Sequence, residues 1–153
     1  MNGLSIPILV MVGITAYAGV YHIVFHAVNG RHERNHLYFG IMSLGVSLYD
    51  ICSIVLYSSA DPARSIMAQH GQFFSIGIIA SQMTLWIFEL TAAPRIQGRI
   101  IAAVYGVIAA LALLPTPATF TRSAVKTRTI LGTSFSEAEP QWLIMIFYAA
   151  FIA

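Results

Sequence analysis

Four apolar stretches of this chain are long enough to cross a membrane, and this feature constrains the fold more than any other. A helix needs about 20 mostly apolar residues to span the roughly 30 Å hydrocarbon core of a bilayer. A fifth apolar stretch holds only 12 residues, too few to cross alone. The sequence therefore predicts one all-α domain, a polytopic transmembrane helix bundle with four full spans and an incomplete fifth. The predicted spans are residues 4–28, 37–58, 72–92, 100–114 and 142–153, with a loop at 115–141.

The composition agrees with a membrane location. Of the 153 residues, 58% are apolar and 9% are charged, whereas soluble domains carry about 25% charged residues. The net charge is +2 and the basic residues are scattered, which argues against a nucleic-acid partner. Cys52 is the only cysteine, so a disulfide within the chain is excluded. The expected surroundings are membrane lipids.

The positions of the basic residues predict an orientation. Two short loops carry arginines directly at the ends of predicted spans, whereas the basic residues on the opposite side lie in longer loops. The positive-inside rule acts most strongly in short loops, so we expect the short loops in the cytoplasm and the N-terminus outside. The short loops contain Arg31, Arg34, Arg95 and Arg99, and the longer ones contain Arg64, Arg122, Lys126 and Arg128.

The long loop at 115–141 has two interpretations. Its threonines and β-branched residues favour a small β-hairpin, which would turn around Gly132 or near Ser123. The alternative is an irregular loop.

Ionisable and polar side chains within the spans predict two layers across the membrane. At about 1.5 Å rise per residue, Asp50 lies within roughly 3 Å of the midplane, close to the depth of Tyr17 and Gln82. By the same arithmetic His22 and Glu89 lie about 9 to 11 Å nearer the cytoplasm. An ionisable group inside a membrane is by default a functional-site hypothesis. The first layer is a candidate ligand- or proton-sensing site; the alternative is that a neutral Asp50 only ties helices together.

His22 and His26 lie on one helix face, because they are four residues apart. This spacing suits two imidazoles that address one metal, or a haem or chlorophyll-type pigment. The alternative places His26 at the headgroup level and gives His22 a hydrogen bond to Glu89 or Tyr21. Further ligands would have to come from the following loop, so we predict no metal site and leave the pigment as a weaker candidate.

Catalytic motifs are missing from the sequence. It contains no phosphate-binding loop, no nucleophile elbow, no His-Glu-Xaa-Xaa-His motif and no lysine within a span to carry retinal. We therefore predict a protein that is not an enzyme.

Several segments resemble the N-terminal multi-span region of bacterial membrane sensor proteins, chiefly histidine kinases and diguanylate cyclases. The resemblance begins with YAGVYH at 17–22 and RHERNHLYFG at 31–40. It continues with LYD at 48–50, LYS at 56–58, KTR at 126–128 and GTSFSE at 132–137. The family usually has an apolar or small residue where Asp50 stands, so the resemblance does not explain that carboxylate.

The resemblance implies a non-catalytic sensory module of the bacterial inner membrane, with an outer surface that senses a ligand. Such regions typically have about seven spans and feed a cytoplasmic output domain. The match stops within the fifth span, so we expect either a truncated copy or a fragment that depends on a missing C-terminal region. The alternative is an accessory subunit of a respiratory or photosynthetic complex, with protein partners in the membrane.

Overall fold

The computed structural model describes residues 5–29, 34–91, 93–114, 119–130 and 132–152. It contains five helices and one β-hairpin, so the prediction of a mostly helical chain is confirmed, but the fold is not purely α. Arg31 and His32 lie outside the described residues. In chain order the elements are α1 (Ser5–Val28), α2 (Arg34–Ser58), α3 (Pro62–Leu90), α4 (Arg95–Ala112), β1 (Phe120–Ile130), β2 (Thr133–Pro140) and α5 (Trp142–Ile152).

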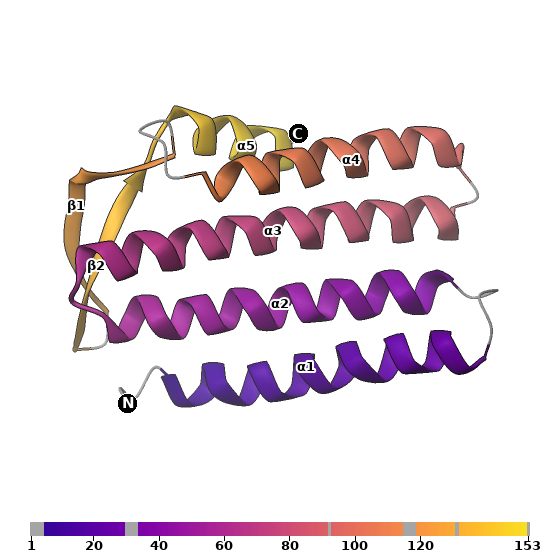
Figure 1. Ribbon diagram of the computed structural model, residues 1–153, viewed down its shortest axis with the longest axis horizontal. Helices are drawn as coiled ribbons and strands as arrows, with labels where there is room; N and C mark the ends of the chain where they lie inside the picture. The colour runs from indigo at the N-terminus through magenta and orange to yellow at the C-terminus, as the bar shows by residue number, and fades with distance from the viewer. Residues whose placement is uncertain (1–4, 30–33, 92, 115–118, 131, 153) are drawn as a thin grey trace.

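Helices α1 to α4 are each long and apolar enough to cross a membrane. They run side by side, up and down, and each packs mainly against its neighbours in the sequence (Figure 1). The result is an open row of helices, whereas the sequence predicted a bundle. Helix α1 lies at one edge of the row and contacts α2, so only 6% of its most apolar window is buried.

Small residues set the close contacts between neighbouring helices. Gly19 of α1 and Gly40 of α2 face each other, because a Cβ atom on either glycine would lie 3.0 Å from the carbonyl oxygen of the other. Gly77 of α3 faces Ala109 of α4, where an added Cβ atom would lie 2.2 Å from the alanine Cβ atom. Small residues commonly allow such approach in membrane helices, where van der Waals packing drives association.

Helix α3 begins ten residues before the predicted span. The prediction assigned residues 59–71 to a loop, but the Asp61 side chain accepts a hydrogen bond from the Ala63 backbone N–H at 3.0 Å and Pro62 is the first helical residue. An Asp N-cap followed by proline is a strong helix start. The hydropathy argument missed these ten residues because the added segment contains buried polar residues, such as Gln69, which bonds to the hairpin. Helix α4 likewise begins at Arg95, five residues before the predicted start.

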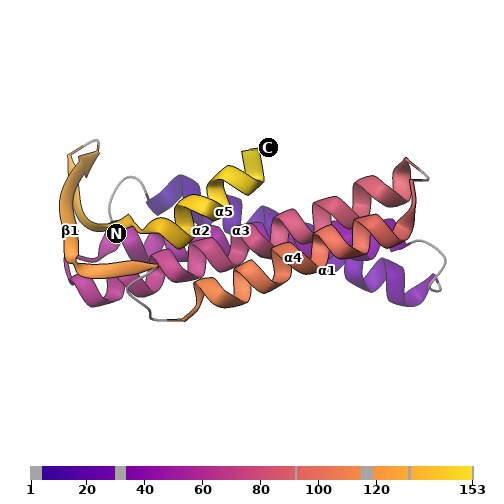
Figure 2. The ribbon, with the colours of Figure 1, turned by 90° about the horizontal axis from the view of Figure 1, so that it is seen from above.

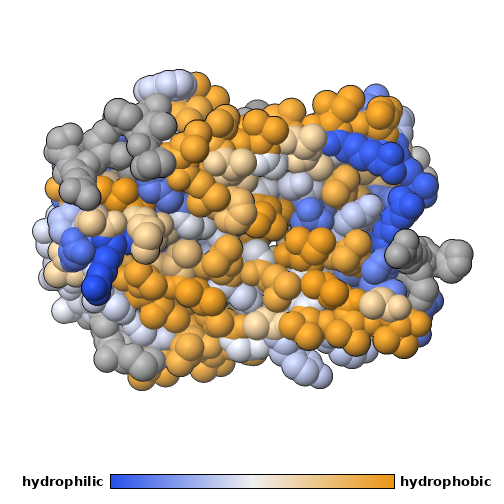
Figure 3. Space-filling model, in the orientation of Figure 1, coloured by the Kyte–Doolittle hydropathy of each residue, from blue (hydrophilic) through white to orange (hydrophobic). Residues whose placement is uncertain are grey.

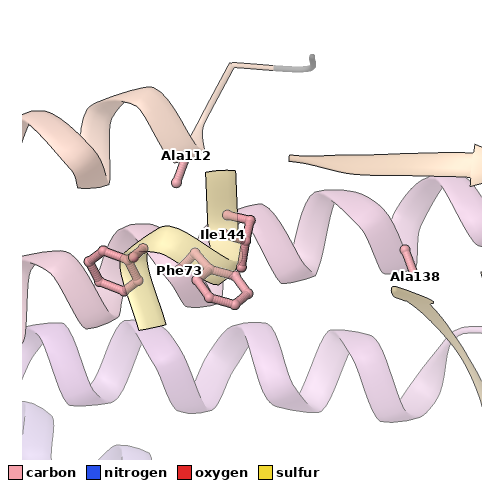
Figure 4. Close-up of a cluster of buried hydrophobic side chains, with 5 residues drawn as sticks. Phe73, Ala112, Ala138 and Ile144 are labelled. Atoms are coloured by element: carbon pink, nitrogen blue, oxygen red, sulfur yellow. The ribbon is translucent and has the colours of Figure 1, made fainter. Parts of the chain in front are cut away.

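The β-hairpin and α5 lie against one end of the helix row. The strands pair antiparallel from Ile130 and Thr133 outward, and Gly132 at the turn has a positive φ of 77°. The hairpin interpretation of the loop at 115–141, with its turn at Gly132, is therefore confirmed. Helix α5 lies over α3 and α4, as Figure 2 shows from a second direction. Figure 4 shows part of the apolar cluster that holds it, made of Phe73, Ala112, Ala138, Ile144 and Phe147.

Polar and apolar residues lie in different parts of the surface along the long axis of the molecule. Figure 3 shows mostly hydrophobic residues across the middle of one face, with the strongest hydrophilic colour at the two ends. We call these ends the hairpin end, which carries the hairpin and the connection from α2 to α3, and the arginine end, which carries Arg34, Arg95 and Arg99. This distribution is that expected for a chain that crosses a membrane.

Candidate functional site

A cavity of about 220 Å³ lies at the hairpin end, between α2, α3, the hairpin and α5. Its lining combines aromatic rings, buried amides and one carboxylate. Small-molecule sites typically combine apolar side chains with a few placed polar groups, and this lining contains side chains of both kinds. The lining residues are Tyr49, Leu56, Tyr57, Gln69, Gln72, Phe73, Ile130, Phe135, Glu137, Pro140 and Tyr148.

Gln69 attaches the hairpin to α3 above the cavity. Its side-chain Nε2 donates to the carbonyl oxygen of Ala138 at 3.0 Å, and its Oε1 accepts from the Ala138 backbone N–H at 2.8 Å. The side-chain amide of Gln69 thereby forms hydrogen bonds with both the backbone N–H and the backbone C=O of Ala138. Gln69 is 5% exposed and Ala138 is fully buried, so these bonds are shielded from water. The hydrogen bond from the Ser136 hydroxyl to the Ala60 carbonyl, at 3.2 Å, adds a second attachment.

Gln72 supplies an oriented polar group to the cavity wall. It lies one turn after Gln69 on α3, is 8% exposed, and donates from Nε2 to the Ser53 hydroxyl at 2.9 Å. Ser53 in turn donates to the Tyr49 carbonyl at 2.9 Å. This chain of hydrogen bonds links α3 to α2 and fixes the position of the Gln72 amide.

Two edge-to-face aromatic pairs join the covering elements to the helices. Tyr57 of α2 contacts Phe135 of β2 with ring centroids 4.8 Å apart and an interplanar angle of 72°. Phe73 of α3 contacts Tyr148 of α5 at 5.2 Å and 76°. Edge-to-face geometry is the preferred arrangement for aromatic pairs. All four rings line the cavity, so the same contacts that hold the hairpin and α5 also shape the site.

Asp50 lines an open hollow of about 480 Å³ next to the cavity. Tyr49 and Tyr148 line both spaces, so they form the boundary between them. The other walls of the hollow are apolar side chains of α2 and α3: Val46, Ile76 and Ile79. Asp50 is thus a carboxylate on an otherwise apolar wall, within reach of the cavity.

The structure does not bring Tyr17, Asp50 and Gln82 of the predicted mid-depth layer into contact. Tyr17 is 75% exposed and stacks on Tyr21 of its own helix, with ring centroids 6.4 Å apart. Helix α2 lies between α1 and α3, so a side chain of α1 does not meet Gln82 across it. These three described residues form no hydrogen bond with one another. The depth argument placed them at one level but carried no information on which helices are neighbours.

His22 bonds to neither Glu89 nor Tyr21, the two partners suggested for it, although the Tyr21 ring contacts the His22 ring edge-to-face with centroids 5.3 Å apart. His22 Nδ1 lies 2.7 Å from Nδ1 of His36 on α2, and the two rings stack with centroids 4.9 Å apart. Glu89 accepts a hydrogen bond from Arg95 at 2.9 Å, across the connection from α3 to α4. Each residue therefore finds its partner on an adjacent helix, and the two groups belong to different parts of the arginine end.

The structure places His26 half-buried one turn after His22. His22 already has a protein partner at Nδ1, and Phe39 contacts its ring edge-to-face at 4.7 Å. Within the described ranges, no group of three or more His, Cys, Asp or Glu side chains has the geometry to hold a metal ion. A haem or pigment at His22 and His26 stays an untested prediction.

The hairpin carries two exposed ion pairs between its strands. Arg128 Nε lies 3.2 Å from Glu137 Oε2, and Lys126 donates to the carboxylate of Glu139. The hydrogen bond and the positive charge of Lys126 hold the pKa of Glu139 below its ordinary value of 4.5. These exposed pairs stabilise the strand pairing only slightly.

Sequence reasoning missed most of the cavity residues. Gln69 and Gln72 lay in the segment predicted as a loop or at its border, although their three-residue spacing would have placed them on one helix face. Tyr49, Phe135 and Tyr148 come from three separate elements, and no local pattern brings them together. His70 of α3 is 7% exposed and donates from Nδ1 to the carbonyl of Ala112 on α4.

No protein-family model matches the chain, and neither the curated proteins nor the solved structures include a match.

Proposed function

We propose that the chain is a non-catalytic sensory module of a bacterial inner membrane, and that it binds a small molecule in the cavity at the hairpin end. The cavity is the observation that carries this proposal, because several elements contribute to its lining and some of the polar groups there are fixed by hydrogen bonds. The arginine end then faces the cytoplasm and the hairpin end faces outward, in accordance with the density of arginines near helix ends.

The family resemblance supports the same location. The segments at 48–50, 56–58 and 132–137, on which the resemblance depends, contribute lining residues of the cavity. These are Tyr49, Leu56, Tyr57, Phe135 and Glu137. The lining combines aromatic and amide side chains, which suits the binding of a small molecule.

A binding screen on the reconstituted chain tests the proposal. The protein is placed in lipid nanodiscs, and small metabolites are screened for an increase in thermal stability, which any ligand specific for the folded state produces. We expect Gln72→Leu to abolish the increase and Gln82→Leu, ten residues along the same helix, to leave it unchanged. Failure of every compound to stabilise the wild-type chain, or equal loss in both variants, would contradict a ligand site here.

The exposed surface of α1 favours a second candidate, an accessory subunit of a larger membrane complex. Tyr17, Tyr21 and eight aliphatic side chains are exposed along this helix, on a surface that suits either lipid or another protein. A photo-crosslinking amino acid at position 17 separates the two functions in native membranes. Crosslinking to one protein of a redox or light-harvesting complex, at a fixed stoichiometry, would favour the accessory subunit. Adducts with lipid alone would favour the sensory module.

A further inference from the structure

We infer that the cavity at the hairpin end recognises a small organic ammonium ion; this inference rests on the proposed binding function and assigns its ligand class. The observation behind it is the composition of the lining. Five aromatic rings line the cavity together with the carboxylate of Glu137, and Asp50 follows in the adjoining hollow. Of the described residues that line the two spaces, none is Lys, Arg or His.

The aromatic rings that line the cavity come from four elements. Tyr49 and Tyr57 belong to α2, Phe73 to α3, Phe135 to β2 and Tyr148 to α5. Aromatic faces carry negative electrostatic potential and attract ammonium groups, most strongly when several rings form a cage. A cavity lined by these rings favours a positively charged ligand over a neutral ligand of the same shape.

Two carboxylates strengthen this preference. The side chain of Glu137 is 41% exposed and shares its Oε2 with Arg128, whose own side chain is 57% exposed and therefore well solvated. Arg128 is not part of the lining, so Glu137 is the charged group that a ligand meets inside the cavity. Asp50 lies beyond Tyr49 and Tyr148, on a wall that is otherwise apolar, where a charge interaction is less screened than in water.

The cavity size and its amides limit the ligand further. Sites for drug-sized molecules usually have at least about 300 Å³, so a cavity of about 220 Å³ suits a compound with few heavy atoms. Gln69 uses both ends of its amide on the Ala138 backbone and acts as a positioning residue. Gln72 and the tyrosine hydroxyls are the groups that would orient a hydroxyl or amide of the ligand.

Choline and its neutral carbon isostere 3,3-dimethylbutan-1-ol provide the test, because they share shape and hydroxyl and differ in charge. Binding is measured by titration calorimetry on the chain in phosphatidylglycerol nanodiscs, which contain no ammonium headgroup. We expect choline to bind at least about tenfold more tightly than the isostere, as expected of a partly desolvated cation over aromatic rings. Glu137→Gln should reduce this ratio severalfold and leave affinity for the isostere unchanged.

Glu139→Gln is the matched control, since Glu139 lies two residues along the same strand, pairs with Lys126 and does not line the cavity. Both variants remove one exposed charge of the hairpin, so a common loss would report on folding and overturn the role of Glu137. Tyr148→Leu, with circular dichroism to verify folding, should weaken choline binding roughly tenfold.

The outcomes separate the ligand class from the site itself. Equal affinity for choline and the isostere would overturn the ammonium inference and keep a small-molecule site, whereas binding of neither would overturn both. Repeating the titration in phosphatidylcholine nanodiscs identifies the source of the ammonium group. Loss of choline binding there supports a lipid headgroup as the natural occupant, and unchanged binding supports a free compound.

Discussion

The two ends of the molecule both bring charged and aromatic side chains together, but the spaces between the described side chains differ greatly in volume. At the arginine end the space lined by Arg34, Glu89, Arg95 and neighbouring side chains measures about 10 Å³, enough for roughly one water molecule. At the hairpin end the cavity measures about 220 Å³. The arginine end joins helices through short connections, and its side chains close on one another. At the hairpin end, strands that are distant in sequence from α2 and α3 pack against these helices and line the cavity together with them.

The comparison shows that a binding site in this fold depends on non-local contacts. Gln69 and Ala138 are 69 residues apart, whereas Glu89 and Arg95 are six apart. A long-range contact costs more chain entropy to form, and buried hydrogen bonds compensate for it here. The hairpin end should therefore be the more sensitive of the two to loss of single polar side chains.

The largest effect is expected from Gln69→Leu. The change leaves the buried N–H and C=O groups of Ala138 without their hydrogen bonds, at a cost of about 2 to 4 kcal/mol. Hydrogen exchange should show the hairpin amides exchanging much faster, while the helices stay protected. Gln97→Leu, at an exposed position of α4 near the arginine end, is the control. Equal exchange in both variants would show that the two ends do not differ as described.

His36→Leu tests the arginine end in the same way. It removes the partner of His22 Nδ1 and should reduce the contact between α1 and α2 by about 1 to 2 kcal/mol. The temperature of thermal unfolding should fall, and the backbone amides of α1 should exchange their hydrogens faster. The hairpin amides serve as an internal reference, because their protection is expected to be unchanged. Faster exchange at the hairpin as well would mean that the two ends are coupled.

Asp50→Asn tests whether the Asp50 carboxylate, in the hollow beside the cavity, contributes to binding at the hairpin end. If the carboxylate contributes to the ammonium site through the adjoining hollow, choline affinity should fall about threefold, as expected for a charge beyond direct contact. Gln82→Ala, which alters a polar residue outside the lining, should leave affinity unaltered. Calorimetric titration of both variants measures the difference, and identical affinities would remove Asp50 from the site.

Arg95→Gln should have a small effect. The pair with Glu89 is partly exposed, at 65% for Arg95 and 21% for Glu89, so its loss should cost roughly 0.2 to 1 kcal/mol. The difference from wild type should shrink at high ionic strength, which screens exposed charges. Thermal unfolding at two salt concentrations measures it. A salt-independent loss would show that the pair is shielded more than its exposure indicates.

The smallest expected effect is the change in the stability of the hairpin with pH. The pKa of Glu139 is lowered in the folded state, so its contribution to stability is present above the ordinary value of 4.5. This contribution of Glu139 to stability is lost as the pH falls through its folded-state pKa, which lies below the ordinary value. Exchange of the hairpin amides, corrected for intrinsic rates, should rise slightly in that acidic range. Lys126→Gln should remove this dependence, and a dependence that persists would assign it to another carboxylate.

Local patterns in the sequence predicted many elements correctly. The first two helices begin and end within three residues of the predicted spans, because length and hydropathy decide whether a helix suits a bilayer. Gly132 indicated the hairpin turn, since few other residues accept its positive φ. The start of α3 was missed because a helix that is buried beneath protein need not be apolar.

The candidate site was much less predictable. Depth along each helix can be calculated from the rise per residue, and it placed Tyr17, Asp50 and Gln82 at one level. Lateral neighbours cannot be calculated that way, and the open row separates α1 from α3. Gln69 and Tyr148 became site residues only through contacts with the hairpin and α3.

The sequence by itself determined that this chain has four membrane-length helices, and it offered a hairpin as one of two interpretations of the long loop, because hydropathy and turn residues act over a few neighbouring positions. The tertiary structure alone decided which helices lie side by side and where a cavity forms. Those depend on the close contact of small residues such as Gly77 with Ala109, and on buried hydrogen bonds between distant residues. The physical reason is that packing partners are selected by complementary surfaces in three dimensions, which no short stretch of sequence specifies.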